Sequence, residues 1–302
     1  MKIFMTGGTG FVGRKLAGKL GQEGNAVTVV TRGASKKASL AEGISYIQAD
    51  PTRPGKWQEK IAEHDVVINL AGSSIFRRWS KAAREEIRQS RIATTENLVQ
   101  ALEARKGKET SFLSTSAVGY YGFQGDRALD ESDSPGQGFL ADVCKEWESK
   151  ALGAASHGAR VAICRFGVVL GRGGGALQKL VSVFRWHLGT QLGSGEQWLS
   201  WIHEEDLVQI YLYVLKHREI TGALNCTSPR PVKNRELTKI LGEVLGRGTF
   251  LPPAPGFIVR LVLGEFGDLF LKGQKALPAK LLQSGFTFKF PDLREALQNL
   301  LS

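Results

Sequence analysis

A glycine-rich turn near the start of the chain has the residue types and spacing needed to bind a phosphate group. Residues 6–13 read Thr-Gly-Gly-Thr-Gly-Phe-Val-Gly, with a short apolar run before them and apolar residues at helical spacing after them. This order predicts a strand, a turn and a helix. Gly8, Gly10 and Gly13 fit the dinucleotide fingerprint Gly-x-Gly-x-x-Gly, and a close variant begins at Gly7. Backbone N–H groups and the positive end of the helix would then face a pyrophosphate. The residues expected to contact the dinucleotide here are Gly7, Thr9, Gly10, Phe11, Val12 and Gly13.

The residues that follow the second expected strand, 26–31, indicate which dinucleotide binds. Proteins that prefer NAD usually place an acidic residue there to hold the ribose 2′-hydroxyl. This chain instead has Thr31 and Arg32, followed closely by Lys36 and Lys37. A carboxylate would repel a 2′-phosphate, whereas a guanidinium can bind it with two hydrogen bonds. We therefore predict NADP(H) as the cofactor; the alternative is that Arg32 only points to solvent.

Two further strand ends should face the same ligand, because parallel strands present ligands at their carboxyl ends. The third expected strand, 44–48, is followed by Asp50, which either accepts a hydrogen bond from the adenine amino group or caps the turn near Pro51. The fourth expected strand lies within residues 65–72 and runs into a turn of small residues. We expect Leu70, Ala71 and Gly72 to contact the cofactor through their backbone and small side chains.

A long helix is expected over residues 81–104, where apolar residues recur on one side. Basic residues spaced by three or four form a stripe along it, and most of such a stripe is expected to be a solvated face. Arg91 lies where the stripe meets the buried side, so we expect it to turn inward toward phosphate, with Glu86 beside the adenosine. The stripe consists of Arg77, Lys81, Arg84, Arg88 and Arg91.

Hydroxyl side chains follow the fifth expected strand, 110–113, in the sequence Ser-Thr-Ser-Ala-Val-Gly-Tyr-Tyr-Gly of residues 114–122. Hydroxyls at a strand end that faces a nicotinamide can polarise a carbonyl during hydride transfer. We predict that Ser114 contacts the cofactor and that Ser116, Tyr120 and Tyr121 are catalytic candidates. Helix or turn capping would also explain the serines, but the added tyrosines favour a site.

Together these motifs resemble the extended short-chain dehydrogenase/reductase superfamily and, within it, the SDR39U1-like epimerase family. The resemblance rests on the glycine turn and on residues 69–72, 77–98, 116–122, 139–148, 165–177 and 201–206, and it covers essentially the whole chain. It implies an extended Rossmann fold that binds NADP, with Ser116 at the place of the superfamily's catalytic serine. Carried over by position, it implies cofactor contacts at Thr31, Arg32, Leu70, Ala71, Glu86, Arg91 and Val169.

One departure from the wider superfamily concerns proton transfer. Members that do redox chemistry carry Tyr-x-x-x-Lys, in which the lysine lowers the tyrosine pKa so that the tyrosine can act as acid and base. Lys145 fits the lysine position, but Ala141 stands four residues earlier and has no hydroxyl. Tyr120, Tyr121 or, more remotely, His203 could substitute. The alternative for all three is packing against the cofactor or hydrogen bonding in the core.

The succession of elements predicts an α/β fold, an NAD(P)-binding Rossmann fold with a doubly wound parallel sheet and a smaller C-terminal lobe. We expect a Rossmann domain over residues 1–250, with substrate-lobe segments at about 166–205 and 220–250. Asp206 is expected to cap a helix over 207–215. Residues 251–302 begin with a proline-rich linker and resemble the DUF1731 domain. This tail is expected to close the substrate side or to form a contact surface, on which a homodimer could assemble.

Bulk properties narrow the class of protein and its partners. The chain has 302 residues, 42% of them hydrophobic, and a net charge of +11, which favours a phosphorylated ligand. No base-reading element accompanies this charge and no apolar run spans a membrane, so we expect neither nucleic-acid nor membrane binding. Cys144, Cys164 and Cys226 lack metal-binding spacing, so no metal site is expected. Reduced thiols and an N-terminus that starts the first strand favour the cytoplasm; an organelle protein with its presequence removed would show the same pattern.

The expected function is NADP(H)-dependent oxidoreductase or epimerase chemistry on a small molecule that the sequence does not identify. In this scheme the cofactor takes or gives hydride, Ser116 polarises a carbonyl, and a tyrosine or an ordered water moves the proton. The epimerase name of the family favours a nucleotide sugar, although no substrate-reading motif supports one directly. The alternative is a catalytically impaired NADP(H)-responsive binding or regulatory module, for which Ala141 is the main support.

Overall fold

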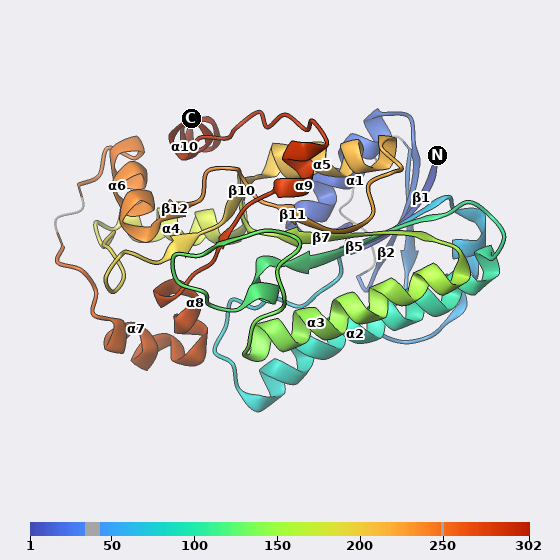
Figure 1. Cartoon of the computed structure of the whole chain (residues 1–302), viewed down its shortest axis with the longest axis horizontal. Helices are drawn as coiled ribbons and strands as arrows, with labels where there is room; N and C mark the ends of the chain where they lie inside the picture. The colour runs from blue at the N-terminus through green and yellow to red at the C-terminus, as the bar shows by residue number, and fades with distance from the viewer. Residues whose placement is uncertain (34–42, 249–250) are drawn as a thin grey trace.

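A seven-stranded parallel sheet forms the centre of the protein, which a computed structural model describes over residues 1–33, 43–248 and 251–302 (Figure 1). The order across the sheet is β11-β7-β5-β4-β1-β2-β3, and every neighbouring pair is parallel. This order reverses direction beside β1, as in dinucleotide-binding folds, so the predicted doubly wound sheet is confirmed. The strands are β1 (Lys2–Thr6), β2 (Ala26–Thr31), β3 (Ile44–Gln48), β4 (Val66–Asn69), β5 (Ser111–Ala117), β7 (Arg160–Phe166) and β11 (Gly222–Cys226).

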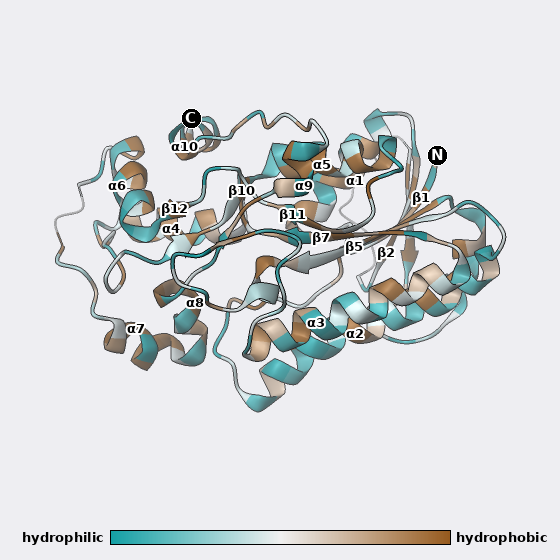
Figure 2. Ribbon diagram, viewed as in Figure 1, coloured by the Kyte–Doolittle hydropathy of each residue, from teal (hydrophilic) through white to brown (hydrophobic). Residues whose placement is uncertain are grey.

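Helices cover both faces of this sheet. α1 (Phe11–Gln22) and α5 (Glu204–Lys216) lie on one face, and α2 (Lys81–Ala101) and α3 (Phe139–Leu152) lie on the other (Figure 1). Because the strands are covered on both sides they are largely apolar, and Figure 2 shows them mostly in brown. Side chains alternate along each strand, so Ile3 and Met5 of β1 join one core cluster and Phe4 joins the other.

The glycine turn lies between β1 and α1, directly against the end of β4. Gly7 has a φ of +71°, and a Cβ atom placed there would lie 2.5 Å from the carbonyl carbon of Leu70. A Cβ on Gly13 would lie 2.1 Å from the carbonyl oxygen of Gly7. Both positions therefore require glycine, because any side chain would push the turn away from β4 or α1 away from the turn. The turn is built for close backbone approach at the edge where the parallel strands end.

Two element boundaries differ from the expectation. β5 continues through Ala117 instead of ending at residue 113, because Ser114, Thr115 and Ser116 keep their parallel register with β7. The hydroxyl-rich segment is therefore buried strand rather than the start of a turn. The long second helix ends at Ala101, and residues 102–105 form a short 3-10 turn.

A smaller lobe of short elements lies beside the sheet, toward the left of Figure 1. Its own core joins apolar side chains of α4, α6 and α10. β8 pairs with β10 in parallel, β9 pairs with β12 antiparallel, and β6 pairs with β13 in parallel. Across the described ranges, every helix falls short of the length or the apolar character that a bilayer span requires. The remaining elements are β6 (Ala128–Leu129), β8 (Val168–Leu170), α4 (Gly175–Arg185), β9 (Trp198–Leu199), β10 (Trp201–His203), β12 (Val232–Lys233), α6 (Asn234–Val244), α7 (Gly256–Leu263), α8 (Asp268–Leu271), β13 (Lys275–Ala276), α9 (Ala279–Gln283) and α10 (Leu293–Leu301), with 3-10 turns at Lys56–Glu63, Leu102–Arg105, Val118–Tyr121, Gly153–His157 and Gly264–Gly267.

The first turn of α5 forms hydrogen bonds with the segment of the chain that precedes α10. His203, not Asp206, caps this helix, because its Nδ1 accepts a hydrogen bond from the Glu205 N–H at 3.0 Å. The predicted capping role of Asp206 is therefore wrong. Asp206 is buried and its two carboxylate oxygens accept the backbone N–H groups of Lys289 and Phe290, at 2.7 and 2.9 Å. The carboxylate thus satisfies two backbone donors of the segment that leads into α10.

We expect Asp206→Ala to lower the free energy of unfolding by about 2–4 kcal/mol, because two backbone N–H groups lose their acceptor. Glu205→Ala is the matched control, since Glu205 is exposed and makes only a surface ion pair with Lys289. It should change stability by less than about 1 kcal/mol. Urea denaturation of the two variants measures the difference, and equal effects would contradict this role of Asp206.

Candidate functional site

A continuous cleft follows the carboxyl ends of the strands and has two compartments. The first has a volume of about 530 Å³ and is lined by the ends of β2 and β4 and by α2. The second has a volume of about 450 Å³ and is lined by the start of α1, the end of β5, α3 and the small lobe. They meet at backbone that lines both, namely Gly7, Gly10, Leu70, Ala71 and Gly72. An elongated ligand can therefore extend from one compartment to the other.

The amino end of α1 faces the place where the compartments meet. Its N-cap is Gly10, which has no side chain to accept hydrogen bonds from the first turn, and that turn contains no acidic residue. The free N–H groups and the helix dipole there favour an anion. Gly7 and Gly10 of the turn line both compartments with their backbone. The site therefore fits the pyrophosphate of a dinucleotide.

Arg91 supplies a positive charge at this junction. Its guanidinium lies 5.3 Å from the centre of the Trp147 ring and donates one hydrogen bond, to the Ile87 carbonyl oxygen at 2.9 Å. Burial lowers the pKa of Arg91, and no carboxylate pairs with it within the described part of the chain. A Cβ on Gly72 would lie only 3.0 Å from its Cζ. An uncompensated guanidinium held in a cleft is suited to bind phosphate oxygens.

The other arginines of the stripe differ from Arg91. Arg77 pairs with Glu86 at 2.7 Å, Arg84 pairs with Glu265, and Arg88 pairs with Glu146. These pairs have exposed or half-exposed partners, so this part of the stripe is a solvated face. Glu86 itself lines the first compartment.

The first compartment is lined by the residues that were predicted to contact the adenosine. Thr31, Arg32 and Asp50 line the first compartment, and Arg32 is exposed. Asp50 Oδ1 accepts hydrogen bonds from the backbone N–H and the hydroxyl of Thr52, at 3.0 and 2.8 Å. Partial burial opposes ionisation, but these hydrogen bonds and nearby Arg32 lower the pKa of Asp50. Asp50 thus caps its turn, and contact with adenine stays a prediction. Lys36 and Lys37 lie outside the described residues.

A buried polar network lies behind the second compartment. Ser116 Oγ donates to Glu148 Oε1 at 2.6 Å, and Arg165 donates to both oxygens of Glu148, each at 2.8 Å. Arg165 also donates to the Tyr121 hydroxyl, which donates to Asn225 Oδ1, both at 2.8 Å. Sequence reasoning missed the roles of Glu148 and Arg165. No local spacing reveals that residues on α3 and β7 meet, because only the packing of that helix on that strand joins them.

This network determines what the hydroxyl candidates can do. Ser116 lines the second compartment, but its proton is directed to Glu148, so it can accept a hydrogen bond from a ligand rather than donate one. Tyr121 does not line the cavity, and burial raises its pKa to about 12. Tyr120 has its ring against Arg165, with the guanidinium carbon 3.5 Å from the ring centre. For both tyrosines, the geometry agrees with core packing and hydrogen bonding.

The α3 face that lines the second compartment carries no acid–base pair. Lys145 is exposed and pairs with Asp142 at 2.7 Å. The expectation that it lies at the site is therefore wrong. The physical reason is the helical repeat, since a one-residue step rotates the side chain by about 100°. The residues of α3 that line the cavity include Leu140 and Cys144, four positions apart. Burial raises the pKa of the Cys144 thiol to about 11.

Two other candidates also lie away from the cavity. His203 is buried, stacks on Phe290 with ring centres 4.0 Å apart, and contacts Asn299 Oδ1 through Nε2 at 3.2 Å. Ser114 is fully buried in β5, and its hydroxyl has no hydrogen-bond partner within the described ranges. The remaining predicted residues line the cleft: Gly7, Thr9, Gly10, Phe11, Val12, Gly13, Leu70, Ala71, Gly72 and Val169.

Comparison with known protein families gives two matches. Residues 3–226 match the NAD dependent epimerase/dehydratase family, and residues 254–300 match a domain of unknown function, DUF1731. An Arabidopsis thaliana protein, "Epimerase family protein SDR39U1 homolog, chloroplastic", is 38% identical over 100% of this chain and 87% of its own length. The Bacillus subtilis epimerase family protein YfhF is 36% identical, with 100% of this chain and 98% of YfhF covered.

Solved structures give the same picture of the fold. Human epimerase family protein SDR39U1, determined with NADPH, superposes with a TM-score of 0.85 at 31% identity and covers 99% of each chain. UDP-glucose 4-epimerase from Thermotoga maritima, determined with UDP-glucose, superposes with a TM-score of 0.78 at 20% identity, covering 100% of this chain and 97% of that one. At that identity the second likeness concerns the fold alone.

We expect Arg91→Met to weaken NADPH binding about tenfold or more, because a charge-assisted phosphate contact is lost. The methionine keeps apolar contact with Trp147, so the thermal unfolding temperature should not fall. Arg88→Met is the matched control on the same helix, because Arg88 already pairs with Glu146. NADPH fluorescence titration checks both variants. Unchanged affinity in Arg91→Met, or an equal loss in the control, would contradict this role.

Proposed function

The chain belongs to the NAD dependent epimerase/dehydratase family, as its sequence led us to expect, and we propose that it is an NADP(H)-responsive binding protein. In this proposal NADP(H) fills the cleft and a second small ligand lies beside the nicotinamide, without acid–base catalysis of epimerisation. The observation that carries the proposal is the face of α3 that lines the cavity. It carries Leu140 and Cys144, four residues apart, and these two side chains cannot do the work of the tyrosine and lysine of a Tyr-x-x-x-Lys pair.

The preference for NADP(H) rests on the charges of the cleft. Arg91 and the free N–H groups of α1 suit the pyrophosphate, and Arg32 directly follows β2, where proteins that prefer NAD usually place an acidic residue. The structure of human SDR39U1 was determined with NADPH, and we extend that cofactor to this chain on these residues. Some neighbours below 25% identity were determined with NAD, so the choice depends on Arg32 rather than on the fold.

The described lining of the second compartment does not include the side chains considered for proton transfer. Bound NADP(H) supplies a hydride donor or acceptor, but epimerisation through a carbonyl also needs a group that removes and returns a hydroxyl proton. Tyr120, Tyr121 and His203 do not line the cavity. The wall near Ser116 is formed instead by apolar side chains such as Val118 and Leu140. Ligand binding is therefore better supported than proton-coupled catalysis.

A second candidate function is hydride transfer with Ser116 and Glu148 as the proton route. The 2.6 Å hydrogen bond between them carries this alternative. A substrate hydroxyl could donate to Ser116 Oγ while Ser116 passes its own proton to Glu148. The hydrogen bonds from Arg165 oppose this route, because they already occupy both oxygens of Glu148, at 2.8 Å each, where an arriving proton would have to bind.

Deuterium transfer distinguishes the two functions. Purified protein is incubated with a small-molecule cell extract and NADPH deuterated at C4 on either face, and products are analysed by mass spectrometry. The binding function predicts that NADPH raises the unfolding temperature while no compound acquires deuterium. A well-characterised NADPH reductase added to the same extract is the positive control. Label transfer by this protein that Ser116→Ala abolishes would overturn the proposal in favour of the second candidate.

We expect Arg32→Ala to weaken NADPH binding about tenfold and to leave NADH binding unchanged, because only NADPH carries the 2′-phosphate. Arg53→Ala is the matched control, because Arg53 is an exposed arginine near Asp50 that does not line the first compartment. Calorimetric titration with both cofactors measures the change. Tighter binding of NADH than of NADPH by the unchanged protein would refute the cofactor assignment.

A further inference from the structure

We propose that the ligand sharing the second compartment with the nicotinamide is a compact, uncharged and largely apolar molecule, not a nucleotide sugar. This inference rests on the NADP(H) binding proposed above. It is argued from four features of the compartment: the composition of its wall, the direction of its polar groups, the pairing of the charges at its rim and its size.

The wall of the compartment is apolar on the sides that the cofactor-binding turn does not form. Ile75 and Phe76 lie on the segment before α2, and Val118 and Leu140 lie near Ser116. Leu199 and Leu269 come from the small lobe. Among the described residues that line the cavity, Arg91 is the only charged one, and it lies at the junction with the first compartment. Burial against such a wall favours apolar ligands.

Most hydroxyl side chains of the wall already have partners inside the protein; the side-chain amide of Gln274 also lines the cavity and is left for a ligand among the described residues. Ser116 donates to Glu148, and Thr115 shares a 3.0 Å hydrogen bond with the Tyr211 hydroxyl. Ser200 Oγ donates to the Gln274 carbonyl oxygen and accepts from the Ala276 N–H, both at 2.8 Å. A ligand with many hydroxyl groups would leave them unpaired in this compartment, which is unfavourable.

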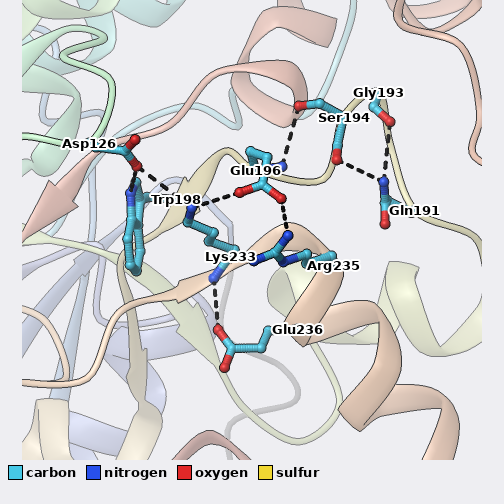
Figure 3. A network of polar contacts seen from close by, with 9 residues as sticks. All are labelled: Asp126, Gln191, Gly193, Ser194, Glu196, Trp198, Lys233, Arg235 and Glu236. Carbon is cyan, nitrogen blue, oxygen red and sulfur yellow. Dashed lines mark hydrogen bonds and ion pairs between the residues drawn. The ribbon is translucent and has the colours of Figure 1, made fainter.

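Trp198, at the rim of the compartment, also has its polar group paired within the protein. Its indole N–H donates to Asp126 Oδ1 at 2.6 Å, so its ring, rather than its polar edge, is free to contact a ligand (Figure 3). Lys233 lies 5.3 Å from the ring centre, and Lys275 lies 4.5 Å from it. Together with Asp126, these two ammonium groups hold the indole in place at the cavity wall.

The cations at this rim are mostly neutralised. Lys233 pairs with Glu196 at 2.7 Å and Arg235 pairs with the same carboxylate, as Figure 3 shows. Lys275 has no carboxylate partner within the described residues, but it does not line the cavity. A diphosphate brings two negative charges, which would require several free donors or cations when removed from water. Of the described basic side chains named at this rim, only Lys275 lacks a carboxylate partner, so the rim offers a diphosphate few free side-chain cations.

The size of the compartment also limits the ligand. Its volume of about 450 Å³ must hold the nicotinamide and its ribose as well, because the compartment includes the glycine turn and Val169. Only part of that volume remains for a second molecule. A small ring system with a single hydrogen-bonding group near Ser116 fits the enclosed part of this space, whereas a larger ligand would extend through its open side.

The experiment uses full-length protein saturated with NADPH and calorimetric titration with three probes: 1-tetralone, 1-naphthoate and UDP-glucose. The first two are similar in size and differ in charge. We expect 1-tetralone to bind about tenfold more tightly than 1-naphthoate, and UDP-glucose to show no binding up to about 1 mM. Tighter binding of UDP-glucose or 1-naphthoate, or no binding of 1-tetralone by the NADPH-loaded protein, would overturn the inference. Failure of NADPH itself to bind would instead overturn the proposed function.

A variant tests the location. Leu269→Lys should weaken 1-tetralone binding and strengthen 1-naphthoate binding, because it places a cation on the cavity wall. NADPH affinity should be unchanged. Leu261→Lys is the control, since Leu261 is a 73% exposed residue of α7 that does not line the cavity. Equal effects of the two variants on 1-tetralone binding would place the ligand elsewhere and overturn the assignment to this compartment.

Discussion

The close backbone contact between the turn after β1 and the end of β4 is the constraint on which the rest of the site depends. Gly7 approaches Leu70, and Gly13 approaches Gly7, so closely that no Cβ fits at either glycine. This contact directs the amino end of α1 into the cleft and sets the junction where both compartments meet. Arg91 reaches the same junction from α2. Strand order, glycine geometry and one uncompensated guanidinium thus converge on a single anion-binding place.

The buried pair of Glu148 and Arg165 has the opposite effect on the second compartment. It engages Ser116 and Tyr121 from behind and directs their polar atoms into the protein. The cavity is left with an apolar wall beside the place where hydride chemistry would occur. We propose on this ground that the Rossmann framework, which also supports epimerases, here serves to recognise a cofactor and a small apolar ligand rather than to move protons.

Local sequence signals predicted the sheet and the glycine turn at the cleft, because apolar runs and glycine spacing report directly on backbone geometry. Which of these residues contact a dinucleotide stays a prediction. Features that depend on contacts between distant segments were not predictable. Lys145 matched a spacing rule but lies on the solvent side of α3. Asp206 looked like a cap but holds the chain 83 and 84 residues further on. The hydroxyls after residue 113 resembled a turn, yet pairing with β7 keeps them in a buried strand.

The central claim is that the pyrophosphate of NADP(H) binds where α1 begins, with Arg91 as its charge partner. A crystal structure of the complex with NADPH tests it most directly. The account predicts the pyrophosphate over the first turn of α1 with an oxygen within hydrogen-bonding distance of Arg91, and the nicotinamide beside Leu140 and Cys144. A pyrophosphate bound away from Arg91, or a tyrosine at positions 120–121 turned toward the nicotinamide, would contradict it.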